Sequence, residues 1–190
     1  MTKLKALDQS VFWWINEHHS TALDWILWCF SQSWCWLSVI TIVFIFITLR
    51  KDRKNWLWVL AGLALCFLLA DQISNNAFKD GIQRLRPCYE LEGVRMFHTN
   101  KGGLYGFVSS HAANAFAVAV FLSLLYGHRI KSLPYLIIIW AVIVGYSRPY
   151  LGKHYPGDVI CGALLGIGIG AMVYFVISKI KSKTASKDSA

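Results

Sequence analysis

The chain has 190 residues and a formal net charge of +9; hydrophobic residues make up 56% of it and charged residues only 15%. Soluble domains average about 25% charged residues, so this composition excludes an ordinary soluble domain and indicates a membrane protein. The length suits one domain, and no Pro-, Gly- or Ser-rich linker divides residues 1–190. In a membrane chain, positive charge is typical of cytoplasmic loops, anionic lipid contacts or an anionic substrate, and we expect no nucleic-acid partner.

The N-terminal segment, residues 4–18, is short and mixed in polarity. Its apolar residues fall on one helical face, and they are Leu4, Leu7, Val11, Trp14 and Ile15. This pattern is typical of an amphipathic helix that lies in the membrane interface, so we assign residues 1–20 to such a helix. The alternative is a sixth membrane span.

Five longer apolar segments follow, and each is a candidate transmembrane helix because a bilayer crossing needs roughly 20 residues. We place these spans at about residues 23–49, 56–78, 110–126, 133–147 and 158–178. The predicted fold is therefore all-α, a polytopic membrane helix bundle of about five transmembrane helices plus the N-terminal interfacial helix.

The last span carries three glycines at a spacing of four, Gly162, Gly166 and Gly170. Small residues at this spacing let two helices approach closely. We expect the stripe to pack inside the bundle; dimerisation is the alternative, and the oligomeric state stays open.

Basic residues predict an orientation. With five spans, ten of the 19 Lys and Arg residues fall on one side, namely Arg50, Lys51, Arg53, Lys54, Arg129, Lys131, Lys179, Lys181, Lys183 and Lys187. By the positive-inside rule this side is the cytoplasm, and residues 179–190 form a cytoplasmic basic tail. The loops 79–109 and 147–157 lie opposite, yet they also hold cations, namely Lys79, Arg84, Arg86, Arg95, Lys101, Arg148 and Lys153. Because these cations break the rule locally, we expect some of them to have another task.

The first polar cluster is KDGIQRLRP, residues 79–87. Lys79 and Arg86 are seven residues apart, so they face one way if the helix continues between them. Pro87 disfavours helical geometry at Arg86 and ends the helix there. Two such cations suit an anion, since Arg clamps phosphate with two hydrogen bonds and Lys adds a point charge. The alternative is that both extend to lipid headgroups.

The second cluster is VSSHAAN, residues 108–114, directly before the third span. Ser109 is a candidate N-cap, and the free N–H groups of the first helical turn form an anion site. His111 falls in that turn, where a structural role is the alternative to a catalytic one.

The third cluster is SRPYLGKHYPGD, residues 147–158. Pro156 and Asp158 suit the first turn of the fifth span, and His154 lies just outside it. A carboxylate can keep one imidazole nitrogen protonated and leave the other free to attack. Together the three clusters supply cations, a helix N-terminus, two histidines and a carboxylate, which is the inventory for phosphoryl transfer through a histidine.

The clusters resemble the three motifs of the type 2 phosphatidic acid phosphatase (PAP2) superfamily, K-x6-R-P, P-S-G-H and S-R-x5-H-x3-D. The first motif corresponds to Lys79 and Arg86–Pro87, and the third to Ser147–Arg148, His154 and Asp158. The second departs from the family pattern because Val108 replaces Pro and Ser110 replaces Gly, while Ser109 and His111 are kept.

The resemblance implies a role for each matched position. His154 would be the nucleophile that forms a phosphohistidine, Asp158 would orient it, and His111 would protonate the leaving group. The phosphate would be bound by Lys79, Arg86, Arg148, Ser109 and the backbone N–H of Ser110. The family's phosphatases require no metal, and we expect no cofactor.

The resulting expectation is a membrane phosphatase that acts on a lipid phosphate or diphosphate at the outer face of a bacterial cytoplasmic membrane. Candidate substrates are undecaprenyl diphosphate, phosphatidylglycerophosphate and phosphatidic acid. A lipid A phosphatase is a close alternative, a non-catalytic lipid-binding or transport protein is a remoter one, and a vanadium haloperoxidase is the third. Lys153 has no role assigned, and a structural hydrogen bond is expected of Asp71.

Overall fold

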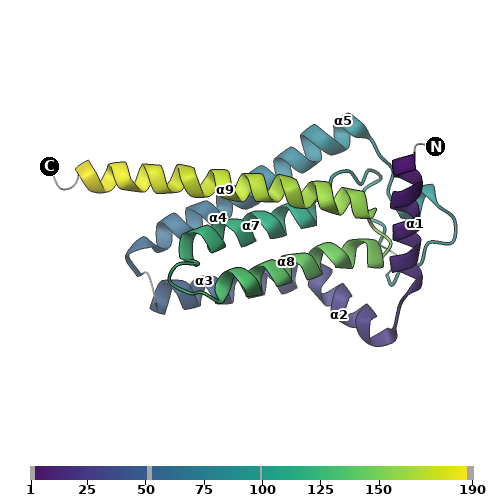
Figure 1. The fold of residues 1–190 in the computed structure, drawn as a ribbon, viewed down its shortest axis with the longest axis horizontal. Helices are drawn as coiled ribbons and strands as arrows, with labels where there is room; N and C mark the ends of the chain where they lie inside the picture. Colours follow the sequence, from purple (N-terminus) through teal and green to yellow (C-terminus); the bar gives the residue numbers. More distant parts are fainter. Residues whose placement is uncertain (1–2, 51–52, 99, 188–190) are drawn as a thin grey trace.

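The computed structural model describes residues 3–50, 53–98 and 100–187, without the side chains of residues 47–50, 185 and 187. The fold is all-α, as predicted, with long helices lying side by side and α1 (Lys3–Glu17) across one end (Figure 1). The bundle consists of α2 (Thr21–Ser31), α3 (Ser33–Arg50), α4 (Trp56–Gln72), α7 (Ser110–Tyr126), α8 (Leu133–Tyr150) and α9 (Pro156–Lys187). Short pieces connect them, namely a 3-10 turn (Arg53–Asn55), a π-helical turn (Ile73–Lys79), α5 (Asp80–Ile82) and α6 (Pro87–Glu90).

Length and composition make three of these helices able to cross a membrane, and four if the bent pair α2–α3 counts as one span. The three are Arg53–Ile82, Leu133–Tyr150 and Pro156–Thr184. α7 is apolar too but has 17 residues, slightly fewer than the roughly 20 that a span needs. The predicted membrane helix bundle is confirmed. The prediction of about five spans counted α7 as one of them, together with the four candidates above.

The first apolar segment, predicted as one span over residues 23–49, is not one continuous helix. α2 ends at Ser31, the backbone is extended at Gln32, and α3 leaves at an angle of 66° to α2. Ser31 and Gln32 both donate side-chain hydrogen bonds to the carbonyl of Trp28, which satisfies this one acceptor near the break. We call this bend, residues 31–33, the elbow.

α7 forms the centre of the bundle, and it packs against α4, α8 and α9. It is rich in alanine, and most of its residues from Ala112 to Leu122 are buried. The glycine stripe of α9 lies directly on it. A Cβ atom at Gly162, Gly166 or Gly170 would lie 2.3–2.5 Å from a carbonyl oxygen of Ser109, Ala113 or Ala117. The expected packing of the stripe inside the bundle is therefore confirmed, and we call this contact the glycine seam.

The chain after α4 differs from the continuous helix expected between Lys79 and Arg86. The helix ends at Ile82, because Gln83 adopts the left-handed conformation with φ 52°. The backbone is then extended at Leu85, which pairs with Tyr105 in an isolated β-bridge. Pro87 does not end that helix but starts α6.

α9 is longer than the predicted span 158–178, since residues 179–187 continue its helix instead of forming a separate tail. Residues 188–190 of the expected tail lie outside the described residues. α7 has the predicted bounds, and α8 extends three residues beyond the predicted end at 147.

α1 is amphipathic, as expected. Leu4, Leu7, Val11 and Trp14 form an exposed row, which suits a membrane interface. Ile15 does not belong to this row, because it is 7% exposed and packs inside with Leu27, Tyr150 and Leu151. The inward face also carries Asp8, Phe12 and Asn16, so α1 is fixed to the bundle by one side and faces outward with the other.

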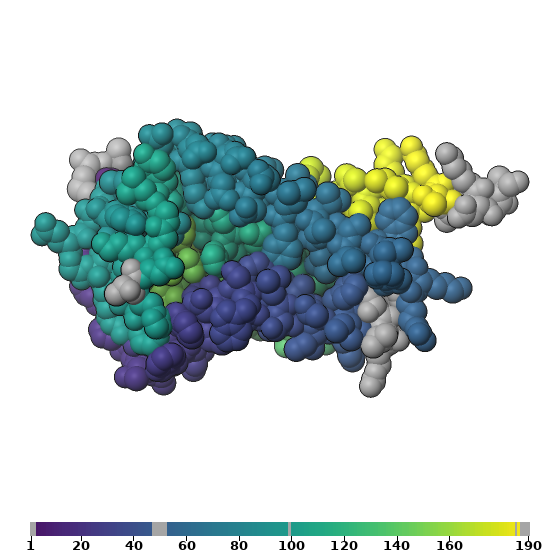
Figure 2. Space-filling model, turned by 180° about the vertical axis from the view of Figure 1, so that it is seen from behind, coloured from purple at the N-terminus to yellow at the C-terminus, as the bar shows by residue number. Residues whose placement is uncertain are grey.

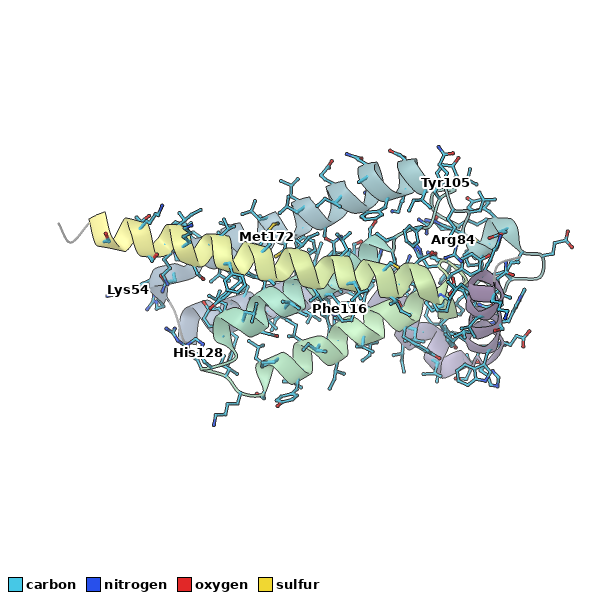
Figure 3. All side chains as sticks on the ribbon, turned by 45° about the horizontal axis from the view of Figure 1, so that its top comes forward. Lys54, Arg84, Tyr105, Phe116, His128 and Met172 are labelled. Carbon is cyan, nitrogen blue, oxygen red and sulfur yellow. The ribbon has the colours of Figure 1, made fainter. Side chains whose placement is uncertain are left out.

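The bundle has two different ends (Figure 1). The α3–α4 connection, the α7–α8 connection and the C-terminus gather at one end, where Figure 3 labels Lys54 and His128. The segment between α5 and α7, the α8–α9 connection and α1 gather at the other, where Arg84 and Tyr105 are labelled. This is the grouping that the positions of the basic residues predicted. Lys51 lies outside the described residues, as do the side chains of Arg50 and Lys187.

Candidate active site

A cavity of about 550 Å³ opens at the end of the bundle that carries α1. Its walls come from the elbow, the end of α4, the segment between α6 and α7, and the α8–α9 connection. Figure 2 shows the opening between the purple-blue α2–α3 pair and the teal segment after α4, with green atoms inside. Six of the predicted site residues line the cavity, namely Lys79, Arg86, Ser110, His111, Arg148 and His154. All three sequence clusters therefore meet at one place.

His154 lies in the short connection between α8 and α9 and is 2% exposed. Its Nε2 is 3.2 Å from Nη1 of Arg86. Because a guanidinium can only donate, Nε2 carries the lone pair, and the proton of the neutral ring is on Nδ1. Burial, and then the charges of Arg86 and Arg148, hold the pKa of His154 well below its usual value. The imidazole is therefore neutral at pH 7, with a free nitrogen toward the cavity cations.

Asp158 lies behind His154 in the first turn of α9 and is completely buried. Its Oδ2 is 3.6 Å from Nδ1 of His154 and accepts a hydrogen bond from the backbone N–H of Tyr155 at 3.0 Å. Nδ1 of His154 has no closer hydrogen-bond partner. The carboxylate is thus placed next to the ring proton, with a small gap between them.

The cations of the cavity differ in how they are held. Nζ of Lys79 donates to Oδ1 of Asn75 at 2.6 Å and to Oγ of Ser110 at 2.7 Å. Nε of Arg86 donates to the carbonyl of Tyr105 at 3.2 Å. Both side chains are therefore fixed by neutral acceptors, and neither forms an ion pair with a residue that the structure describes.

Arg148 has no such support. It is 3% exposed in the last turn of α8, and its guanidinium makes no hydrogen bond or ion pair with any residue that the structure describes. Lys153, which had no predicted role, also lines the cavity. Burial, and then Arg148 and Arg86, lower the pKa of Lys153 to about 8. A buried cluster of four cations with one carboxyl group, that of Asp71, is costly unless an anion enters, so this arrangement suits an anion.

The start of α7 faces the cavity with Ser110 and His111 but not with Ser109. Ser109 is completely buried, and its Oγ caps the helix by accepting from the N–H of Ala112 at 3.5 Å. The predicted N-cap is confirmed, while phosphate binding by Ser109 stays a prediction. Oγ of Ser110 accepts from Lys79 and from Ser74, and the ring of His111 packs edge-to-face with Trp36.

Some residues of the site carried no sequence signal of their role. Arg84 forms an ion pair with Asp158, at 2.9 Å, and with Asp8 of α1, at 2.6 Å. These contacts join positions 74 and 76 residues apart, and only the fold brings them together. Asp71 and Asn75 line the cavity as well, and the Asp71 backbone carbonyl accepts from Ser74. Among the described residues, no group of three or more His, Cys, Asp or Glu side chains is placed to hold a metal ion.

Three comparisons with known proteins agree with this geometry. The sequence model of a family described as the PAP2 superfamily matches residues 55–182. The chain is 32% identical over 187 residues to a lipid A 4'-phosphatase of Bacteroides thetaiotaomicron, covering 96% of this chain and 82% of that protein. It is 33% identical over 137 residues to phosphatidylglycerophosphatase B of Bacillus subtilis, covering 68% and 62%. The crystal structure of a transmembrane PAP2-type phosphatidylglycerolphosphate phosphatase from Bacillus subtilis superposes with a TM-score of 0.70 at 20% identity, covering 96% and 88% of the two chains.

Proposed function

The chain belongs to the PAP2 superfamily and is a lipid phosphatase of that type; from this premise we propose that it transfers the phosphate of a membrane lipid to His154 and then to water. The observation that carries the proposal is the cavity, in which a neutral buried imidazole faces four cationic side chains and a single carboxyl group, that of Asp71, among the described lining residues. A phosphate dianion is the ligand that this charge arrangement lacks.

In the first step, Nε2 of His154 attacks phosphorus while the bond from phosphorus to the ester oxygen breaks. The lone pair is available because Nε2 already acts as an acceptor toward Arg86. Asp158 stabilises the positive ring through Nδ1, across the 3.6 Å gap. His111, which becomes an imidazolium next to the bound phosphate dianion, gives its proton to the leaving oxygen, so the lipid departs as a neutral alcohol and His111 is left neutral.

The negative charge of the transferring group is stabilised by Lys79, Arg86 and Arg148. Arg148 stabilises this negative charge most among the three, because its guanidinium has no hydrogen bond to a described residue that phosphate would have to replace. Lys153 adds charge at the same cavity.

In the second step, a water molecule attacks the phosphohistidine as His111 accepts its proton. The bond between phosphorus and Nε2 breaks, and inorganic phosphate leaves the cavity. His154 regains its lone pair and His111 its proton, so the cycle closes with one water consumed.

We place the phosphate of an acylated sugar, as in lipid A, first among the candidate substrates, because the relative that covers nearly the whole chain is a lipid A 4'-phosphatase. Phosphatidylglycerophosphate follows, as the substrate class of the second relative. Undecaprenyl diphosphate and phosphatidic acid complete the panel. The wall formed by residues 89–107, with Asn100 and Gly102 at the cavity, contacts the part of the lipid next to the phosphate.

We further propose that the site opens to the outer face of a bacterial cytoplasmic membrane. The described cations at the opposite end support this orientation through the positive-inside rule. In a cysteine-free background, a cysteine at Lys101 should react with an impermeant maleimide added to intact spheroplasts. Labelling only after permeabilisation would reverse the orientation.

Phosphate release from the purified protein, measured with that lipid panel, tests the function. His154→Ala should lower turnover by about 10³-fold or more, while His128→Ala, at the far end of the bundle, keeps wild-type turnover. Orthovanadate should inhibit phosphate release. Activation of halide oxidation by vanadate would favour a haloperoxidase instead. Absence of phosphate release from every lipid of the panel would favour a binding or transport protein. Near-normal turnover of His154→Ala would refute the proposed nucleophile.

A further inference from the structure

Asp158 has two oxygens, and each has a different partner. Oδ2 faces Nδ1 of His154 and accepts from the Tyr155 backbone, whereas Oδ1 accepts from Nη1 of Arg84 at 2.9 Å. The contact of Oδ1 with Arg84 fixes the rotation of the carboxylate about its Cβ–Cγ bond. With this rotation Oδ2, which the backbone N–H of Tyr155 also holds, lies beside Nδ1 of His154.

Arg84 is itself held from outside the bundle. Its Nη2 donates to Oδ2 of Asp8 at 2.6 Å, and its guanidinium lies 4.1 Å from the ring centre of Tyr155. Burial lowers the pKa of Arg84, but Asp158 and Asp8 raise it by more, so Arg84 stays charged. The other oxygen of Asp8 accepts from the N–H of Gly157 at 2.7 Å, at the first turn of α9. Asp8 thus positions both Arg84 and the backbone next to Asp158.

Asp8 belongs to α1, which lies before the region matched by the family model. Figure 3 shows Arg84 at the end of the bundle where α1 crosses it. The row of side chains Asp8, Arg84, Asp158 and His154 therefore runs from the N-terminal helix to the cavity. Arg84 does not line the cavity, so it cannot bind the phosphate directly.

We infer that Arg84 is a positioning residue for the nucleophile, that it acts by fixing the carboxylate of Asp158 toward Nδ1 of His154, and that Asp8 of α1 holds it there. The inference rests on the proposed role of His154. It assigns α1 a part in catalysis besides membrane contact. The alternative is that the ion pairs of Arg84 with Asp8 and Asp158 only attach α1 to the bundle. In that case, removal of a different link between α1 and the bundle would lower kcat equally.

The chain offers a matched control for that distinction. Lys5, also on α1, forms an ion pair with Glu90 near the same site. Glu90 accepts from the hydroxyl of Tyr155 but does not contact Asp158. Lys5→Met therefore removes a link of α1 without disturbing the carboxylate that faces His154.

The test compares Arg84→Met, Arg84→Lys, Asp8→Asn and Lys5→Met in phosphate release. Arg84→Met should lower kcat by about 10²-fold, as misplacement of a reacting group does, with KM changed less than about threefold because the phosphate ligands remain. Arg84→Lys should recover part of kcat, Asp8→Asn should lower it about 3- to 10-fold, and Lys5→Met less than about twofold. Asp8→Asn leaves Asp158 its partner, so it remains informative if Arg84→Met fails to fold.

A second measurement does not depend on turnover. In protein labelled with ¹⁵N-histidine, the shifts of His154, assigned by comparison with His154→Ala, should report the Nδ1–H tautomer in the wild type and in Lys5→Met. Arg84→Met and Asp8→Asn should keep this tautomer, because Arg86 still donates to Nε2, but should change the Nδ1 shift as the contact with Asp158 is weakened. Unchanged His154 shifts in both variants, or equal kcat losses in Asp8→Asn and Lys5→Met, would overturn the inference. Turnover by His154→Ala would instead refute the proposed nucleophile, and the comparison of Nδ1 shifts would still decide the role of Arg84.

Discussion

Replacement of Arg148 by methionine should stabilise the empty protein while it lowers kcat/KM by about 10²–10³-fold. The guanidinium is 3% exposed and has neither an ion pair nor a hydrogen bond to a described residue, and Arg86 and Lys153 line the same cavity. Methionine has a similar length but no charge. It therefore removes both the repulsion between the Arg148 guanidinium and the neighbouring cations and the cost of burying that guanidinium away from water.

The magnitude follows from the contacts. Leaving a buried polar group without a partner costs about 1–3 kcal/mol, and more for a charged group. Relief of this cost should raise the unfolding midpoint by about 2–12 °C, at about 2–4 °C per kcal/mol for a chain of this size. Loss of one charge-assisted clamp on the transferring phosphate should lower kcat/KM by about 10²–10³-fold.

Thermal unfolding in detergent measures the first effect. A thiol-reactive fluorophore suits it, because Cys66 and Cys88 are buried and become reactive on unfolding. Orthovanadate at 100 times its Kd should stabilise the wild type by about 2.7 kcal/mol, and Arg148→Met should lose most of this shift. The control is Arg95→Met, which removes an arginine that is bound to both oxygens of buried Asp24, and it should destabilise by about 3–5 kcal/mol.

Two outcomes would refute this reasoning. If Arg148→Met unfolds at a lower temperature than the wild type without vanadate, the guanidinium is compensated in the empty site. If it keeps the full vanadate shift, Arg148 is not a ligand of the anion.

The pH dependence of Lys153→Arg should reveal the charge at that position. Since burial and the neighbouring arginines lower the pKa of Lys153 to about 8, the wild type loses this proton as pH rises through 8, while arginine keeps its charge. The ratio of kcat/KM between variant and wild type should therefore rise from pH 7 to pH 9, and a constant ratio would show that Lys153 does not contact substrate. Gly166→Ala should destabilise the glycine seam by about 1–3 kcal/mol, because its Cβ would lie 2.3 Å from the carbonyl oxygen of Ala113. Gly168→Ala, with nothing within 4 Å of the new Cβ, should be neutral or stabilising by up to about 1 kcal/mol; equal midpoints for the two variants in the same unfolding assay would contradict close packing at the seam.

The sequence predicted the bundle and the meeting of the three clusters because both depend on local patterns. Apolar length marks a span, and Ser109 before an apolar run marks a helix start. The positions of basic residues predicted which connections share an end. These signals need no knowledge of the neighbouring helices.

The elbow and the row from Asp8 to His154 were not predicted, for two different reasons. Ser31–Gln32–Ser33 is a short polar interruption that a hydropathy window averages away, although three polar residues in an apolar run are visible in the sequence. The partners Asp8 and Arg84 are 76 residues apart, and their pairing depends on where α1 crosses the bundle. For the same reason the sequence did not separate Ser109, which is buried as a cap, from Ser110, which faces the cavity.

The glycine seam has a consequence for how a lipid reaches the cavity. α7 and α9 touch backbone to backbone, and each begins with a proposed catalytic group, His111 on α7 and Asp158 on α9. Such contact leaves little room for α9 to shift against α7, whose first turn lines the cavity with Ser110 and His111. The elbow lines the same cavity, and there two helices meet at 66° around a single extended residue, Gln32. The cavity thus combines the densely packed start of α7 with a break between two helices, and we expect a headgroup to be admitted on the side of the elbow.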